Sequence, residues 1–404
     1  MAYSFAHKKI LLGITGGIAA YKSAVLVREL IKQGAAVRVM MTEAASRFVT
    51  PLTFETLSDY PVAMDMFDSH RTSSTWHIEW ARWPDVIIIC PATANTIAKV
   101  AHGVADNMVT TILMAAKTPI IFCPAMNCEM YKNRFYQHNE QLLRENGYFV
   151  IAPEEGELAC GEKGVGRLAD LNDIVSETYW VLNQTNSLAD KKVVVTAGPT
   201  REAIDPVRFI SNRSSGKMGY ALAENAAIRG AHVTLISGPT ALKPPRHVHF
   251  KSVDSAQEMA SAVAESAAES DILIMSAAVA DFRPKEKSSQ KLKKDEFGFN
   301  LQLEPTTDIL KSAAGHKKNQ IIVGFALETE NVLENGKKKL AQKNCDLMVV
   351  NNPFVAGAGF DVDTNQGYLV FRNQEPIHLP LMSKWDMAGE ILNHIERLSI
   401  DHKY

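Results

Sequence analysis

The sequence has little cysteine, no long apolar run and no excess of either charge. Its 404 residues include five cysteines (Cys90, Cys123, Cys128, Cys160 and Cys345), an odd number without a CxxC pair. Neither a disulfide framework nor a zinc site is therefore expected. No run approaches the roughly 18 apolar residues of a membrane span. Forty-three basic residues offset 45 acidic ones along the chain, which calls for neither nucleic acid nor a membrane surface as partner.

The N-terminus resembles a secretory signal, because Lys8 and Lys9 precede the apolar segment ILLGITGGIAA. Three glycines interrupt that segment and an amphipathic pattern follows, so we interpret it as a first strand and expect no export. A reducing cytoplasm is the expected location. The segment GITGG also departs from the dinucleotide fingerprint GxGxxG, and SSGKMG at 214–219 departs from a Walker A loop at Ser211 and Met218.

Two signatures of strand, loop and helix begin at Lys9 and Lys192, and each opens a series of alternating strands and helices. This alternation predicts an α/β protein with two open, doubly wound (Rossmann-like) parallel-sheet domains in tandem. The polar stretch 183–190 is the best linker, so we place the domains at 1–190 and 191–404. The second domain is expected to end in a hairpin at 367–372 and a closing helix from Lys384.

Ligands of open parallel sheets bind beyond the carboxyl ends of the strands, so the residues after each strand indicate the site. In the first half, small, hydroxyl and amide groups follow four strands, as a phosphorylated ribityl or ribosyl ligand would need. They are Gly16, Gly17 and Ile18; Thr42; Thr93, Ala94, Asn95 and Thr96; and Ala125 with Asn127. The glycines of GITGG, taken alone, fit a cofactor site and a tight structural turn equally well.

Two residues stand outside these loops. His77 lies among tryptophans in STWHIEWARW, where a histidine is more often packed or simply exposed than catalytic. Cys160 lies in GELACGEKGVGRL, a glycine-rich segment that we expect to be irregular. A cysteine in a mobile polar loop gains nothing from core packing, which favours a chemical role.

Five motifs occur in a fixed order along the first half: the GGIA turn, the His77 segment, PATANT at 91–96, PAMN at 124–127 and the segment around Cys160. Together they resemble the flavin-containing cysteine decarboxylases, in particular phosphopantothenoylcysteine decarboxylases. The resemblance implies FMN, held by Gly16–Ile18, Thr42, Thr93–Thr96 and Ala125, with the pocket completed by a neighbouring subunit of a trimer.

The implied chemistry gives each of three residues a role. A flavin accepts hydride from the cysteinyl thiol, and the resulting thioaldehyde is the electron sink for loss of CO2. His77 suits a base near neutral pH, and Asn127 suits orientation of the substrate carboxylate. Cys160, a thiol that is mostly protonated at pH 7, suits the acid that protonates the enethiolate.

The second half carries a long first loop, GPTREAIDPVRFISNRSSGKMG, then MSAAVADFRP at 275–284 and KLKK at 291–294. This set resembles phosphopantothenate–cysteine ligases. The resemblance implies CTP with Mg2+ and an acyl-cytidylate that cysteine converts into product, with 4'-phosphopantothenate and cysteine as the other substrates. Lys291 would stabilise developing charge, Asn212 would assist turnover of the acyl-cytidylate, and Arg208 belongs to the same loop. The implied nucleotide contacts are Ser276, Ala277, Ala278, Asp281, Lys291, Thr306, Thr307, Asp308, Ile309, Phe325, Lys339 and Lys343.

One motif departs from the ligase pattern, because Thr306-Thr307-Asp308-Ile309 stands where related sequences often read NPDI. Such loops often contribute backbone groups, which would survive the change. The resemblance implies a homo-oligomer with trimeric flavin domains and dimeric ligase domains, which together would form a closed particle such as a dodecamer.

Two alternatives stay open at this point. A flavin oxidoreductase fused to an NADP-binding Rossmann domain fits the alternation of strands and helices, although GxGxxG is missing. A non-catalytic, flavin-binding regulatory subunit fits the first domain, and in it His77 and Cys160 would be dispensable.

Overall fold

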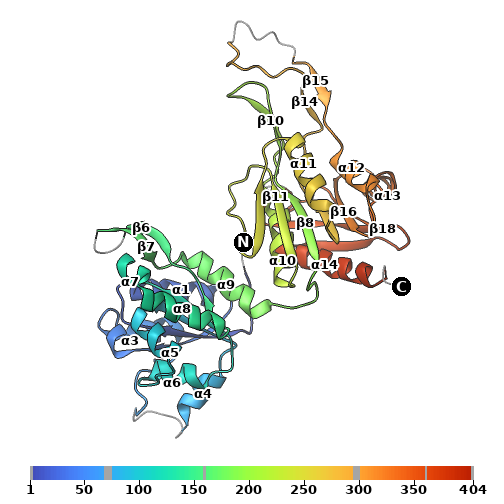
Figure 1. The fold of residues 1–404 in the computed structure, drawn as a ribbon. Coiled ribbons are helices and arrows are strands. Elements are labelled where there is room, and N and C mark those ends of the chain that lie inside the picture. The colour runs from blue at the N-terminus through green and yellow to red at the C-terminus, as the bar shows by residue number, and fades with distance from the viewer. Residues whose placement is uncertain (1–2, 68–74, 158–160, 294–300, 360–361, 402–404) are drawn as a thin grey trace. The chain divides into compact units, whose positions relative to one another are not determined.

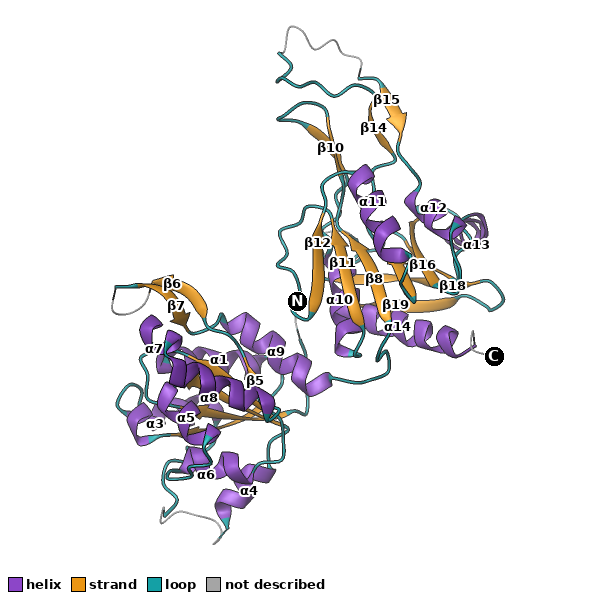
Figure 2. Ribbon diagram, viewed as in Figure 1, coloured by secondary structure: helices purple, strands orange, loops and turns teal. Residues whose placement is uncertain are grey.

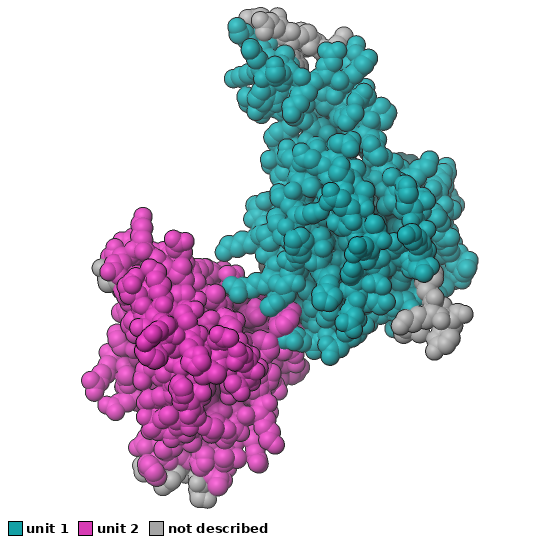
Figure 3. All heavy atoms as spheres, viewed as in Figure 1, with its two compact units in different colours: residues 1, 184–404 teal, residues 2–183 magenta. Residues whose placement is uncertain are grey.

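The computed structural model describes residues 3–67, 75–157, 161–293, 301–359 and 362–401. The chain divides into two compact units, residues 2–183 and residues 184–404 with residue 1 (Figure 3). Within the described ranges, no helix combines the length and apolarity needed to cross a membrane.

The N-terminal unit is built on a five-stranded parallel sheet in the order β2-β1-β3-β4-β5 (Figure 1). The strands are β1 (Lys9–Ile14), β2 (Ala36–Met41), β3 (Val86–Ala92), β4 (Ile120–Pro124) and β5 (Phe149–Val150). The helices are α1 (Ala20–Lys32), α2 (Glu43–Ser46), α3 (Pro51–Ser58), α4 (Trp76–Arg82), α5 (Ala94–Ala101), α6 (Met108–Ala115), α7 (Cys128–Lys132), α8 (Arg134–Glu145) and α9 (Leu171–Asn183).

Helices cover both faces of this sheet, so successive residues of a strand enter different cores. Ile10 and Leu12 pack with α1 and α9, whereas Leu11 packs with the core that includes α4, α6 and α8. This burial on both faces explains the near-continuous apolarity of the strands.

The C-terminal unit contains an eight-stranded sheet in the order β12-β11-β8-β13-β16-β17-β18-β19 (Figure 2). The strands are β8 (Lys192–Ala197), β11 (His232–Ser237), β12 (Val248–Ser252), β13 (Ile272–Met275), β16 (Ile321–Leu327), β17 (Leu347–Asn351), β18 (Thr364–Phe371) and β19 (Ile377–Ser383). Helices α10 (Lys217–Ile228) and α14 (Lys384–Asp401) pack on one face; α11 (Ala256–Ala267), α12 (Ile309–Gly315) and α13 (Val332–Gln342) pack on the other.

The prediction of two α/β domains with parallel sheets is confirmed, with one addition. In the second sheet, the six neighbouring strands β12, β11, β8, β13, β16 and β17 are parallel, but β18 and β19 extend it in antiparallel fashion. The hairpin predicted at 367–372 is present but longer than predicted: residues 367–371 end β18, the turn occupies 372–376, and β19 forms the second strand. The closing helix begins at Lys384 as predicted.

Three antiparallel ribbons stand apart from the sheets. They are β6 (Glu154–Glu157) with β7 (Lys163–Arg167), β9 (Arg201–Ala203) with β10 (Phe209–Ser211), and β14 (Phe282–Pro284) with β15 (Leu303–Pro305). The expectation that the segment around Cys160 is irregular is wrong for its flanks, which pair as β6 and β7. Gly166 of β7 lets the backbone of the ribbon approach the loop at Met126 closely. A Cβ on Gly166 would lie 2.3 Å from the Met126 carbonyl oxygen, and its φ of +156° disfavours other residues.

Candidate functional site

The carboxyl edge of the first sheet brings the predicted loops together. Thr15, at the end of β1, donates through Oγ1 to the Pro91 carbonyl at 2.7 Å and accepts from the Thr93 backbone N–H at 2.9 Å. Thr93 caps α5, and its hydroxyl lies 3.1 Å from that of Thr96. These bonds fix the loop after β1 against the loop after β3.

Gly16 has no room for a side chain, because a Cβ there would lie 2.4 Å from the Cβ of Ala44 in α2. Gly17 is less constrained, since its nearest neighbour would be the Thr93 methyl at 3.6 Å. Helix α1 follows without a side-chain cap, and the N–H groups of Ala20 and Lys22 donate to the carbonyls of Gly17 and Ala19. The close backbone approach at Gly16 suits a phosphorylated ligand such as FMN.

Thr42 and Ala125 complete this edge in different ways. Thr42 caps α2 through its hydroxyl and donates its backbone N–H to the Ile14 carbonyl at 3.0 Å. Ala125 donates its N–H to the Ala92 carbonyl at 3.2 Å, which ties β4 to β3. Exposed Ile18 supplies apolar surface beside the glycines.

Asn127 caps α7 immediately after β4. Its Oδ1 accepts from the Glu129 N–H at 2.8 Å, and its Nδ2 donates to Glu162 Oε2 at 2.8 Å. Glu162 lies just before β7, and β7 is bound to the same loop because Met126 N–H donates to the Gly166 carbonyl at 2.9 Å. The β6–β7 ribbon is therefore attached beside Asn127, whereas Cys160 lies outside the described residues.

His77 lies far from this group. It is a half-buried residue of α4, and α4 and the β6–β7 ribbon are at opposite ends of the N-terminal unit (Figures 1 and 2). The tryptophans around it have a structural role, since the Arg38 guanidinium lies 4.3 Å from the Trp83 ring centroid and 5.6 Å from that of Trp80. One copy of the chain does not bring His77 and Asn127 together.

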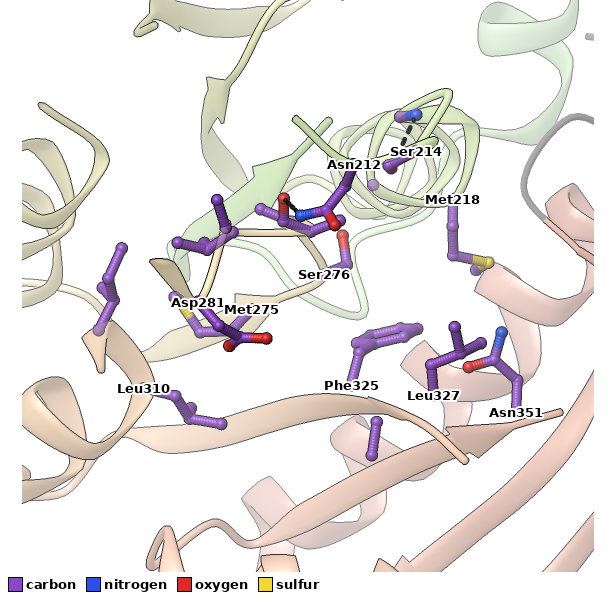
Figure 4. A pocket seen from close by; sticks show the side chains of 18 of the residues that line it. Asn212, Ser214, Met218, Met275, Ser276, Asp281, Leu310, Phe325, Leu327 and Asn351 are labelled. Carbon is purple, nitrogen blue, oxygen red and sulfur yellow. Dashed lines mark hydrogen bonds between the residues drawn. The ribbon is translucent and has the colours of Figure 1, made fainter. Parts of the chain in front are cut away.

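In the C-terminal unit, a cavity of about 660 Å³ opens at the carboxyl edge of the sheet (Figure 4). Every predicted nucleotide contact except Lys291 lines it, and so does Asn212. Figure 4 shows Asn212 and Ser276 on one side, with Phe325, Leu327 and Asn351 across from them. Ser276 is fixed by donation from its hydroxyl to the Thr196 carbonyl at 2.6 Å.

The long first loop ends at the N-terminus of α10, as predicted from SSGKMG. Gly216 is the N-cap residue with φ of +77°, in the left-handed region that favours glycine, and no side chain caps the helix. Ser214, Ser215 and Lys217 line the cavity beside it. This end of the cavity combines backbone N–H groups with a cation, a suitable setting for phosphate.

Four lysines and two aspartates line the cavity, so its charge suits a polyanion. Lys339 pairs with Glu328 at 2.7 Å, Lys217 with Asp363 at 2.8 Å and Lys343 with Asp308. Burial tends to raise the pKa of Asp308, but hydrogen bonds from Lys343 and the Lys311 N–H outweigh burial and lower that pKa. The described residues contain no cluster of three or more His, Cys, Asp or Glu that could hold a metal ion.

Two lining residues escaped sequence reasoning. Lys384, almost fully buried, donates through Nζ to the carbonyls of Gly359 and Val362 at 2.8 and 2.7 Å. Buried Asn365 accepts the Gln366 N–H at 3.0 Å. Asn365 lies within antiparallel strand β18, and Lys384 directly follows antiparallel strand β19. A search limited to the loops after parallel strands therefore does not find them.

Arg208 and Lys291 lie outside the cavity. Arg208 donates to the Leu292 carbonyl at 3.1 Å, and the Leu292 N–H donates to Asp205 at 3.3 Å. Leu292 thus ties its segment to the loop of the β9–β10 ribbon. In Figure 1 this ribbon and the β14–β15 ribbon extend away from the eight-stranded sheet.

Comparison with known proteins places these two sites in context. Residues 3–183 match the family described as Flavoprotein, and residues 188–398 match the "DNA/pantothenate metabolism flavoprotein C-terminal domain". The "Coenzyme A biosynthesis bifunctional protein CoaBC" of Bacillus subtilis is 48% identical over 97% of this chain and 98% of its own length. Its namesake in Escherichia coli is 43% identical over 96% of each. A crystal structure of a CoaBC C-terminal domain is 45% identical, covers 54% of this chain and all of its own, and has a TM-score of 0.47.

Proposed function

The chain belongs to the family of coenzyme A biosynthesis bifunctional proteins, and on that premise we propose which residues carry its two reactions. The enzyme joins 4'-phosphopantothenate to cysteine and decarboxylates the resulting 4'-phosphopantothenoylcysteine. The flavoprotein unit, residues 2–183, performs the decarboxylation, and the C-terminal unit performs the ligation. The alternatives of an NADP-linked oxidoreductase and a regulatory subunit are set aside.

In the flavoprotein unit, FMN is held by the loops at Gly16–Ile18, Thr42, Thr93–Thr96 and Ala125. Bound FMN would supply the oxidation of the substrate thiol, which makes loss of CO2 feasible. The close approach at Gly16 and the hydroxyls of Thr93 and Thr96 support this assignment. Asn127 orients the substrate carboxylate, His77 accepts the proton from the substrate, and Cys160 returns one after CO2 leaves.

We propose that a second copy completes this site, and the position of α4 at the opposite end of the unit from the β6–β7 ribbon supports the proposal. His77 of one subunit would meet Asn127 and Cys160 of its neighbour, as in the trimer that the sequence resemblance implies. Alanine substitution of His77 and of Cys160 tests this: wild-type decarboxylation by both variants would overturn their assignment.

In the ligase unit, CTP occupies the 660 Å³ cavity, and the observation that carries the proposal is the convergence of eleven sequence-predicted contacts on it. The carboxylate of 4'-phosphopantothenate attacks the α-phosphate of CTP and releases pyrophosphate, and the amine of cysteine then displaces CMP. Lys339 and Lys343 neutralise the phosphates of CTP, and Asn212 holds the acyl-phosphate end of the acyl-cytidylate, where cysteine reacts. Mg2+ would enter together with the phosphates, because Mg2+ keeps several waters and needs few protein ligands. Asp281 on the cavity wall is the carboxylate that we propose as its contact.

Lys291 and Arg208 act in this scheme only from another copy or after a movement of the ribbons. We propose that a dimer of ligase units brings them to the cavity of the partner, and that the trimeric and dimeric contacts together build a closed cytoplasmic particle. The test of the ligase is pyrophosphate release, which should require CTP, 4'-phosphopantothenate and cysteine together. Pyrophosphate release at the same rate with ATP in place of CTP would overturn the nucleotide assignment.

A further inference from the structure

The Glu162 carboxylate accepts hydrogen bonds from an amide and a thiol next to the decarboxylation residues, and it also interacts electrostatically with Lys132. Its Oε2 accepts from Asn127 Nδ2 at 2.8 Å and lies 3.5 Å from the Cys128 sulfur. Cys128 is buried, and burial together with Glu162 raises the pKa of its thiol, so the thiol stays protonated and donates. An amide and a thiol thus form a small carboxylate-binding site that a side chain of the protein itself occupies.

The same amide is the group that the proposed function assigns to the substrate carboxylate. The side-chain oxygen of Asn127 caps α7, so a carboxylate can be bound only through the amide nitrogen, and one of the two hydrogens of that nitrogen is donated to Glu162. Two carboxylates on one amide nitrogen repel each other at such short range. Glu162 and the substrate carboxylate therefore compete for Asn127.

Glu162 can move away without detachment of the ribbon. Gly161, directly before it, has φ of +84° and no described atom within 4 Å of the position of a Cβ, so no packing contact there opposes a change in the backbone. Further along, the bond from Met126 N–H to the Gly166 carbonyl holds β7 in place. The anchor and the competing carboxylate are separate parts of the ribbon.

We propose that Glu162 occupies the position of the substrate carboxylate on Asn127 until substrate binds, and that this exchange sets the affinity for carboxylate-bearing ligands. The inference rests on the proposed role of Asn127. It makes Glu162 a positioning residue that distinguishes the substrate from the decarboxylated product, because only the substrate must displace it.

The experiment compares Glu162→Gln and Glu162→Ala with Glu157→Gln, which removes the same charge from β6 of the same ribbon. For both Glu162 variants we expect the KM for 4'-phosphopantothenoylcysteine to fall roughly three- to tenfold, the range for losing a partly exposed charge–amide contact. We expect kcat to change by less than about twofold. The inhibition constant of 4'-phosphopantetheine, which has no carboxylate, should stay constant. Glu157→Gln should change none of these values.

A purely structural role gives the opposite result. If Glu162 only anchors the ribbon, KM and the inhibition constant rise together in both variants, and the inference is overturned. Asn127→Ala distinguishes failure of the proposed function from failure of the inference. Wild-type decarboxylation by this variant defeats the proposed role of Asn127. If this variant is impaired but the Glu162 variants keep the wild-type KM, only the inference is defeated. Flavin content and circular dichroism confirm that each variant is folded.

Discussion

The side-chain amide of Asn212 donates a 2.8 Å hydrogen bond to the carbonyl oxygen of Ala278. This bond joins the end of the long first loop to the loop after β13, so two walls of the cavity in the C-terminal unit are fixed to each other. Residues 66 positions apart in the sequence thereby form one surface.

Loss of this bond should impair ligation selectively. Asn212→Asp places a carboxylate against the Ala278 carbonyl, and we expect kcat/KM for pyrophosphate release to fall at least about tenfold, since an unpaired polar contact costs about 1–3 kcal/mol. Decarboxylation of added 4'-phosphopantothenoylcysteine should be unaffected. An equal loss of both activities would indicate general misfolding instead.

Two adjacent glycines should differ in their tolerance of alanine. Gly16→Ala forces a Cβ to within 2.4 Å of Ala44, whereas Gly17→Ala meets nothing closer than 3.6 Å. We expect the first variant to be purified with little or no FMN and the second to keep its yellow colour. The flavin absorbance per protein decides the matter, and similar retention by both would refute the proposed contact at Gly16.

The ion pair of Asp308 and Lys343 predicts a pH dependence. The pKa of Asp308 is lowered in the folded state, so its contribution to stability is present above its usual pKa of about 3.9 and disappears as pH falls through the folded value. Asp308→Asn keeps the cap of α12 but removes the charge. The variant should therefore melt below the wild type at pH 6, and the difference should shrink as the pH falls below about 3.9 toward the lowered folded value. A constant difference across this range would contradict the assignment.

A buried and an exposed ion pair in the C-terminal unit should differ in strength. Lys317 Nζ lies 2.5 and 2.6 Å from the carboxylate oxygens of Asp346, which also accepts the Ile322 N–H, and both side chains are largely buried. Asp346→Ala should lower the free energy of unfolding by about 2–4 kcal/mol, because a charge and an N–H lose their partner. Glu265→Ala, which breaks a solvent-exposed pair with Lys251, should cost less than about 1 kcal/mol in the same urea titration.

The periodic parts of the fold could be predicted from the sequence. The strands expected to begin at Lys9 and Lys192 are β1 and β8, because burial on both faces of a sheet imposes a regular apolar pattern. The ribbon β6–β7 could not, since its glycines serve contacts with Met126 and Cys128 that no local pattern encodes. For the same reason Lys384 was identified only as the start of a helix.

The site was predictable where it follows parallel strands and unpredictable where it depends on tertiary contacts. The loops at Ser276 and Phe325 lie on one cavity because carboxyl ends of parallel strands meet at one edge. Neither the pairing of Asn127 with Glu162 nor the remoteness of His77 follows from spacing in the sequence.

If, as proposed, two subunits share each decarboxylase site, the separation of α4 from the β6–β7 ribbon has a genetic consequence. A chain with His77→Ala and a chain with Asn127→Ala would each be inactive alone as decarboxylases. In mixed assemblies, some active sites would combine an intact His77 from one chain with an intact Asn127 from the other. Two defective alleles expressed in the same cell could then restore growth that neither supports by itself.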